Sequence, residues 1–365
     1  MNQKEKMKCM KKKILVLNQG ITENYGDIAI NDTIITFLKN QGFQVDYFPF
    51  WLEELIFGKE YVKIPNLIMK IICHLQPILD LRMKRVIKNH IEISKYNAII
   101  IGGGELLCGH RGFNTALYIW TKIAKKNNVP IYVLGVSGNK KMHRNLLKRN
   151  KKSLQRCTEI WVRDTYTYKI CKNLYNVNCK HKPDVVFAYK TICRSAEKVK
   201  KSYIRNSLIC VPISYEILKN KMNFKSQEEY FFYLCGLIDK KLKPNDEIII
   251  TSTVGTDNRF SNDFYEWLKQ HLKNNSVTFK KYTNIDDYIN LVNNAHTIIS
   301  ARMHALILGL IYGCDIVVIP FKEKLEIFEK EYSSKINLEN IEREALESLE
   351  EISKDINRKN KSVEK

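Results

Sequence analysis

Arg302 and His304 form an Arg-x-His pair at the junction between a predicted strand and a predicted helix. The β-branched run 297–300 is typical of a strand end, and residues 301–312 have no proline and no glycine before Gly309, which predicts a helix. Unpaired backbone N–H groups and the positive end of the dipole meet at a helix N-terminus. The guanidinium of an Arg adds a bidentate hydrogen-bond donor, and the imidazole of a His adds a group that can donate a proton near neutral pH. This set suits an anion that is protonated or loses phosphate, although a helix start with a solvated cation would use the same residues.

A second candidate segment follows the first predicted strand, residues 13–18. The loop 20–27 contains Asn24, Gly26 and Asp27, and ligands of parallel α/β sheets lie beyond the carboxyl ends of strands. The alternative is that Asp27 caps the following helix. The loop lacks the glycine spacing of a dinucleotide-binding fingerprint.

A glycine triplet, which includes Gly103 and Gly104, follows the buried apolar strand predicted over 97–101. Glycines at such a position let backbone amides approach an anion closely, or let two backbones pack together. The sequence therefore places a second candidate anion-binding loop after a strand.

The remaining chain alternates short apolar runs with helical patterns, which predicts parallel sheets with right-handed crossovers. The 365 residues exceed the usual size of one core, so we expect two α/β domains. Six Lys or Arg residues in seventeen positions mark a linker. The predicted segments are an N-terminal domain over 1–189, a basic linker over 190–206, a C-terminal domain over 207–335, and a helix with a charged tail over 336–365.

The chain carries 60 basic and 39 acidic residues, a formal net charge of +21, which favours an acidic partner. The lysines are spread over every segment, so part of this charge reflects composition. Ten cysteines without a Cys-x-x-Cys spacing argue against a disulfide framework and a zinc site, and favour a reducing cytosol. We expect no nucleic-acid partner, because no RNA- or DNA-binding motif is present.

Residues 50–95 are predicted to form amphipathic helices with Arg82, Lys84, Arg85 and Lys88 at polar positions, and with a kink or break at Pro77. Such a region could pack on the first domain, bind a partner or lie on a membrane surface. A solvated helix face is the favoured interpretation. No apolar run is typical of a signal peptide or a membrane span.

Several of these segments together resemble the polysaccharide pyruvyl transferase family. The family pattern is Ser-x-Arg-x-His, an apolar helix, a strand, then an aromatic residue and a Lys three positions later; here these are Ser300 to His304, Phe321 and Lys324. Asn24 to Asp27, the glycine triplet and the pair Arg163–Asp164 match further family segments in family order. Phe321 stands where the family usually has Tyr.

The resemblance implies a GT-B-like fold, two Rossmann-like domains with parallel sheets facing a cleft. It also implies transfer of pyruvate from phosphoenolpyruvate to a sugar of a cell-surface polysaccharide or its precursor, as a cyclic ketal. Arg163, Arg302 and Lys324 would then hold the donor, and His304 would be the general acid. We expect no cofactor and no metal. Arg163 could instead simply pair with Asp164.

Two alternatives stay open at this point. A nucleotide-sugar glycosyltransferase would share the two-domain architecture and the basic pocket. A non-catalytic basic protein would use the +21 charge to bind membrane or nucleic acid, with salt-sensitive affinity. The expected location is the cytoplasm, with the inner membrane face included if the acceptor is lipid-linked.

Overall fold

The computed structural model describes residues 11–20, 22–58, 75–194, 205–272, 275–281, 283–332 and 337–361. The chain divides into two compact units, each built from more than one segment. The first unit comprises Met1–Gly20, Ile30–Val185 and Arg343–Lys365, and the second comprises Ile21–Ala29 and Val186–Glu342. Each unit contains its own sheet.

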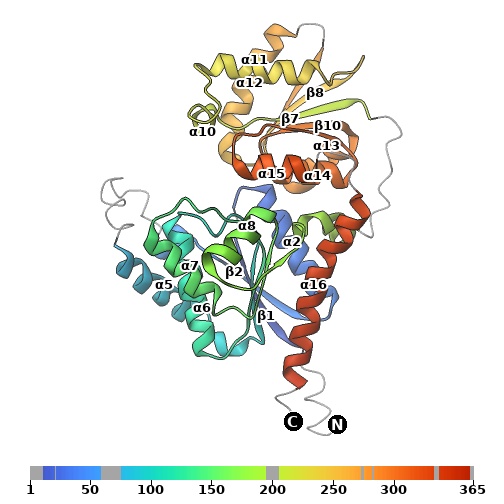
Figure 1. Cartoon of the computed structure of the whole chain (residues 1–365). Helices are drawn as coiled ribbons and strands as arrows, with labels where there is room; N and C mark the ends of the chain where they lie inside the picture. Colours follow the sequence, from blue (N-terminus) through green and yellow to red (C-terminus); the bar gives the residue numbers. More distant parts are fainter. Residues whose placement is uncertain are drawn as a thin grey trace. The chain divides into compact units, whose positions relative to one another are not determined.

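The first unit is built on six parallel strands in the order β2-β1-β3-β4-β5-β6. Figure 1 shows α5, α6 and α7 on one face of this sheet, and α2 and α16 on the other. The strands are β1 (Lys13–Asn18), β2 (Gln44–Pro49), β3 (Ala98–Gly102), β4 (Ile131–Val136), β5 (Glu159–Val162) and β6 (Lys180–His181). The helices are α2 (Tyr25–Asn40, in this unit from Ile30 onward), α3 (Glu53–Phe57), α5 (Gln76–His90), α6 (Arg111–Lys126), α7 (Arg144–Leu154) and α8 (Thr165–Ile170).

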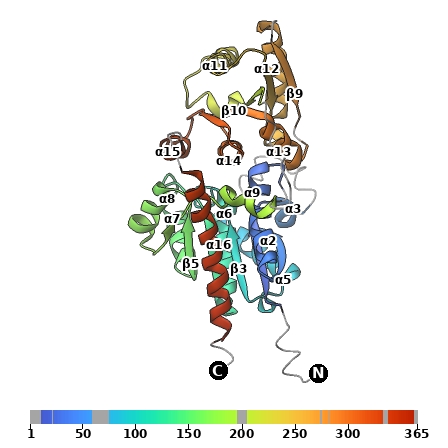
Figure 2. The same cartoon turned by 90° about the vertical axis from the view of Figure 1, so that its right-hand side faces the viewer.

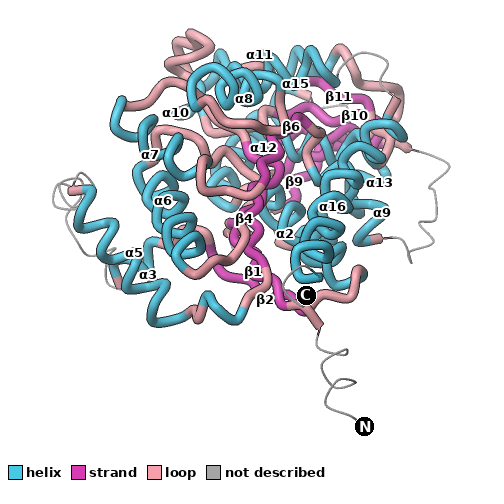
Figure 3. Tube along the Cα trace, turned by 60° about the horizontal axis from the view of Figure 1, so that its bottom comes forward, coloured by secondary structure: helices cyan, strands magenta, loops and turns pink. Residues whose placement is uncertain are grey.

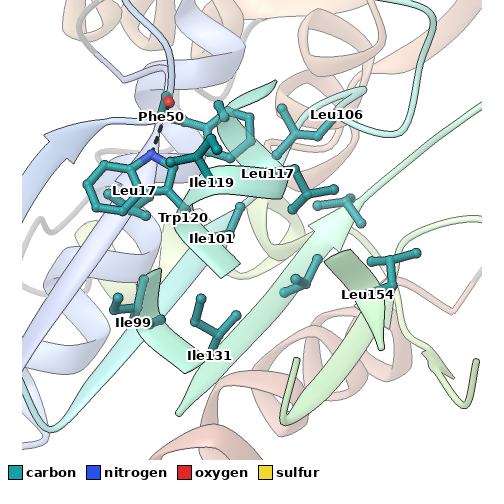
Figure 4. Packing of buried hydrophobic residues seen from close by; sticks show 14 of the residues in the cluster. Leu17, Phe50, Ile99, Ile101, Leu106, Leu117, Ile119, Trp120, Ile131 and Leu154 are labelled. Carbon is teal, nitrogen blue, oxygen red and sulfur yellow. Dashed lines mark hydrogen bonds between the residues drawn. The ribbon is translucent and has the colours of Figure 1, made fainter. Parts of the chain in front are cut away.

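The core of this unit follows from strands that are apolar on both faces. All five residues of β3 are buried, as a central strand covered by helices on both sides requires. Figure 4 shows Ile99 and Ile101 beneath Trp120, whose indole N–H donates to the carbonyl of Phe50 at 3.3 Å. The indole is therefore buried without losing its hydrogen bond.

The second unit is built on five parallel strands in the order β11-β10-β7-β8-β9. Figure 2 labels β9 and β10 of this sheet. The strands are β7 (Ser207–Val211), β8 (Glu247–Thr251), β9 (Ser276–Lys280), β10 (Ala295–Ser300) and β11 (Asp315–Val318). The helices are α9 (Tyr189–Cys193), α10 (Tyr215–Leu218), α11 (Gln227–Asp239), α12 (Asn258–His271), α13 (Ile285–Asn294), α14 (Met303–Ile311) and α15 (Glu323–Tyr332). The two parallel sheets confirm the predicted fold class.

The last helix, α16 (Leu338–Lys361), joins the first unit from Arg343 onward. Its apolar face is buried, and its acidic residues bind that unit through Tyr132–Asp355 at 2.6 Å and Lys182–Glu347 at 2.7 Å. Helix α16 thus stabilises the first unit.

The structure describes only part of the region between residues 50 and 95. Leu75 is not helical and α5 begins at Gln76, so Pro77 lies in the first turn of a helix, where its missing N–H leaves no bond broken. Residues 59–74 of the predicted amphipathic region lie outside the described residues. None of the described helices is both long and apolar enough to cross a membrane.

Candidate active site

The Arg-x-His pair lies where the predicted strand–helix junction is observed. Strand β10 ends at Ser300, Arg302 is the extended N-cap residue, and His304 is the second residue of α14. The Arg302 N–H donates to Oγ of Ser300 at 2.8 Å, and this hydroxyl donates to the Val211 carbonyl at 3.2 Å. Ser300 thereby fixes the turn that places both side chains at the carboxyl edge of the sheet.

The guanidinium of Arg302 is bound by a carboxylate that the motif does not contain. Its Nε donates to Oδ2 of Asp257 at 2.9 Å, and Nη2 contacts the same oxygen. The Asp257 side chain is 1% exposed and the Arg302 side chain 26%. Oδ1 of Asp257 is buried and has no hydrogen-bond partner among the described residues. The carboxylate therefore acts on Arg302 through one oxygen and leaves part of the guanidinium facing solvent.

The loop that carries Asn24 packs against the second sheet. The Tyr25 N–H donates to the Thr253 carbonyl and the Gly255 N–H to the Glu23 carbonyl, both at 2.9 Å. The Tyr25 ring lies on Tyr288, with ring centroids 5.4 Å apart. This segment, Ile21–Ala29, belongs to the same compact unit as the Arg-x-His pair.

The polar residues of this loop organise the start of α2. Oδ1 of Asn24 accepts from the Gly26 N–H at 2.9 Å, and Oδ2 of Asp27 accepts from Asn24 Nδ2 at 2.9 Å and from Thr22 Oγ1 at 3.1 Å. The interpretation of Asp27 as the helix cap is therefore wrong. Asn24 is the residue that caps α2, and the Asp27 carboxylate accepts a hydrogen bond from the side-chain amide of Asn24.

Gly26 lies directly against the imidazole of His304. A Cβ added at Gly26 would come within 2.2 Å of Nδ1 and 2.7 Å of Cγ of that ring, much closer than any real contact. His304 is half-buried as a result. The structure thus brings together two predicted site segments that are far apart in the chain, and only glycine fits at their contact.

Lys324 is the second residue of α15, after β11, and its side chain is half-buried. Phe321, the departure from the family pattern, is 7% exposed. Its ring lies under the ammonium groups of Lys221 and Lys322, at 5.5 and 5.4 Å from the centroid. An aromatic ring at this position is thus held by packing and by cation–π contacts, which a phenyl ring provides as well as a phenol.

Arg163 lies in the first unit, immediately after β5, and is buried. Its Nη1 donates to Oδ2 of Asp184 at 2.7 Å and its Nη2 to Oγ of Ser137 at 2.9 Å. The expected alternative, a pair with Asp164, is wrong because Asp164 caps α8 by accepting from the Thr167 N–H at 2.7 Å. Arg163 is joined to residues from two neighbouring strand ends.

Ser137, which binds Arg163, also connects that arginine to the glycine triplet. The Ser137 N–H donates to the Gly104 carbonyl at 2.9 Å. Gly103 and Gly104 have φ values of 66° and 84°, which glycine adopts without strain. A Cβ at Gly103 would come within 2.5 Å of the Ile30 side chain, so close helix–strand packing also requires this glycine.

Sequence reasoning missed Asp257, Ser137 and Tyr25. Each follows a strand at its carboxyl end or lies in the loop after it, which is the one signal that could have found them. Burial raises the pKa of the Tyr25 hydroxyl despite the hydrogen bond from Thr283, so it stays protonated at neutral pH. No group of three or more metal-ligating side chains occurs among the described residues.

The family model for polysaccharide pyruvyl transferases matches residues 24–322, from the Asn24 loop to the strand after the Arg-x-His helix. The chain belongs to the polysaccharide pyruvyl transferase family. No curated protein matches its sequence. The family is one of transferases, and the match covers every site segment described above except Lys324, which lies just beyond it.

Solved structures share the fold of this family member. The UDP-GlcNAc 2-epimerase of Methanocaldococcus jannaschii has a TM-score of 0.52 and 13% identity, over 93% of this chain and 92% of that one. The Neisseria meningitidis UDP-GlcNAc 2-epimerase bound to UDP-GlcNAc has a TM-score of 0.52 and 11% identity, over 96% and 93%. The S. aureus MnaA–UDP complex has a TM-score of 0.54 and 11% identity, over 93% and 87%. At these identities the likeness shows the fold alone, which is the GT-B architecture of two parallel α/β sheets.

Proposed function

We propose that this protein transfers the pyruvyl group of phosphoenolpyruvate to two hydroxyls of one sugar, as a cyclic ketal. The acceptor is a sugar of a cell-surface polysaccharide, an exopolysaccharide or a precursor of either. The observation that carries the proposal is the Arg302–His304 pair at the N-terminus of α14, within a chain of the pyruvyl transferase family. No cofactor has a part in it.

The donor fits the charges of the second unit. Phosphoenolpyruvate has a phosphate and a carboxylate, and Arg302 with Lys324 supplies one planar and one compact cation. Asp257 holds one edge of the guanidinium, so the solvent-facing part of Arg302 is the part assigned to the donor. The first-unit candidates Arg163, Gly103 and Gly104 keep a donor role only as a proposal, since the Arg163 guanidinium is bound to Asp184 and Ser137.

The reaction needs one proton at carbon and one leaving group. Protonation of C3 of the enol makes C2 electrophilic, and a sugar hydroxyl attacks C2 and loses its proton. A second hydroxyl of the same sugar then attacks C2, the C2–O bond to phosphate breaks, and phosphate departs with the second proton. His304 is assigned as the general acid, which delivers a proton to C3 or to the leaving phosphate.

Replacing His304 tests this assignment. General acid catalysis contributes roughly 10²–10⁴-fold, so His304→Ala is expected to lower turnover by about that factor with the fold intact. Turnover is measured as phosphate released from phosphoenolpyruvate in the presence of a cell-surface polysaccharide fraction. A variant that turns over at the wild-type rate would remove His304 from the chemistry.

Calorimetric titration tests the donor. Phosphoenolpyruvate is titrated into the wild type and into Arg302→Ala, beside UDP-sugars as competing donors. We expect phosphoenolpyruvate to bind the wild type and to lose most of its affinity for the variant. Binding of a UDP-sugar instead would discard the pyruvyl donor and leave the GT-B fold with glycosyl transfer.

A further inference from the structure

Helix α5 of the first unit has exposed apolar side chains in addition to the apolar face that packs on the core. Leu79, Met83, Val86 and Ile87 face the core, as an amphipathic helix requires. Ile78 and Leu81 of α5 are 39% and 57% exposed, and Leu75, the N-cap residue just before the helix, is 45% exposed. They are half of the six large hydrophobic side chains that are most exposed in the described part of the chain. Three such residues within seven positions form a patch rather than scattered surface.

The second half of the same exposed face is basic. Lys84, Arg85 and Lys88 are exposed and follow Leu81 along the helix. The one acidic residue of α5, Asp80, is bound by Arg149 at 2.7 Å, so its charge is compensated. The outer face of α5 therefore runs from apolar to cationic, and Figure 3 shows α5 on the outer side of α6.

A hollow of about 710 Å³ continues the basic half beyond the end of α5. Lys88 and His90 line it, together with residues 91–96. Its volume is sufficient for a charged headgroup of a lipid. The apolar row, the cations and the hollow thus follow one another along one helix.

We propose that α5 binds the protein to the surface of an anionic lipid bilayer. Leu75, Ile78 and Leu81 would enter the boundary of the acyl chains, and Lys84, Arg85 and Lys88 would lie on anionic headgroups. A nucleic acid would gain nothing from an exposed leucine row, and a charge of +21 complements an anionic surface. This surface goes beyond the proposed function, and it would place the enzyme where lipid-linked acceptors occur.

Sedimentation of the full-length protein with vesicles tests this surface. Vesicles of phosphatidylglycerol and phosphatidylcholine are compared with phosphatidylcholine alone. We expect binding to the anionic vesicles, about 100-fold weaker for Lys84→Gln/Arg85→Gln/Lys88→Gln, since each cation near such a surface contributes about fivefold. Ile78→Ser/Leu81→Ser should weaken binding at least tenfold, because two apolar side chains stay in water.

Matched variants in the second unit provide the controls. Lys240→Gln/Lys241→Gln/Lys243→Gln removes the same charge from another exposed cluster, and Phe232→Ser removes a side chain that is 54% exposed. Both should bind anionic vesicles as the wild type does. Equal losses in the two triple variants, no loss in Ile78→Ser/Leu81→Ser, or no binding at all would each overturn the proposal. Phosphoenolpyruvate titration of the same variants keeps this result separate from the proposed function.

Discussion

The two arginines that follow strand ends, Arg163 in the first unit and Arg302 in the second, are each bound to a buried carboxylate. Arg163 and Asp184 are 2.7 Å apart and both side chains are 4% exposed. Arg302 is 26% exposed, although its partner Asp257 is 1% exposed. In both units a cation after one strand binds an acid that follows another strand of the same sheet: β6 beside β5 in the first unit, and β8, two strands away from β10, in the second. The two pairs differ in how far the arginine is exposed.

The difference in exposure leads to different expectations for the two arginines. In the first unit, Ser137 and Asp184 occupy the guanidinium of Arg163, and burial makes this pair costly to break. In the second unit, the carboxylate holds one edge of Arg302, and water reaches the rest. An anion can displace that water, so we infer that the Arg302 pair is the one that meets substrate.

The largest effect should come from breaking the enclosed pair. Arg163→Ala leaves Asp184 charged and buried, which is expected to lower the free energy of unfolding of the first unit by about 3–5 kcal/mol. Urea unfolding in a Trp267→Phe background reports on that unit, because the three other tryptophans belong to it: Trp51, Trp120 and Trp161. Removing Asp184 as well should restore part of the loss. Unchanged unfolding in Arg163→Ala would erase the distinction between the two arginines.

The next effect concerns the exposed pair and is read in donor affinity. Arg302→Ala removes charged hydrogen bonds, so phosphoenolpyruvate should bind about 10- to 100-fold more weakly. Asp257→Ala should weaken binding about tenfold, because the guanidinium loses the group that orients it. Asp257→Asn, which keeps an acceptor oxygen, should retain most of the affinity.

A double variant shows whether Asp257 acts through Arg302. Calorimetry on Arg302→Ala/Asp257→Ala should give the affinity of Arg302→Ala alone, because a positioning residue has nothing left to position. Tighter binding in both Asp257 variants would mean that the carboxylate repels the donor instead of orienting its ligand.

Much of the fold could be predicted because local patterns determine it. The continuous apolar runs of β1, β3 and β10 indicate strands buried on both faces, and these strands are buried in the structure. Asp164 and Ser226 cap helices as their types predict. These features depend on neighbours within one or two turns.

The candidate site could be predicted only in part, because its partners are distant in the chain. Asp164 is next to Arg163 in the sequence, but its side chain caps α8. The guanidinium of Arg163 binds Asp184 instead. Nothing local marks Asp257 as the partner of Arg302. Similarly, the packing of Gly26 on His304 joins the first loop to a late helix, and this contact depends on tertiary structure that no periodicity encodes.

A smaller effect should come from the contact between Gly26 and His304. Gly26→Ala pushes the imidazole of His304 aside, and misplacement of this proposed general acid should lower kcat about tenfold or more. Gly236→Ala is the matched control in the same unit, since a Cβ there has no neighbour within 4 Å. In a His304→Ala background, Gly26→Ala should cause no further loss of turnover. A further loss would mean that Gly26 has a role apart from His304.

The smallest effect tests the first unit by acid. Burial alone would raise the pKa of Asp355, but hydrogen bonds from Lys359 and Tyr132 outweigh it and lower the pKa. Since the folded pKa is depressed, the stabilisation is complete above the ordinary value of about 3.9 and is lost as pH falls through the folded value. Water screens the group, so the contribution is below about 1 kcal/mol. In the Trp267→Phe background, Asp355→Asn should unfold in urea more easily than its parent at pH 5, and the difference should shrink as the pH falls below the ordinary pKa of about 3.9. A constant difference across this range would show that α16 is held to the first unit by packing without this charge.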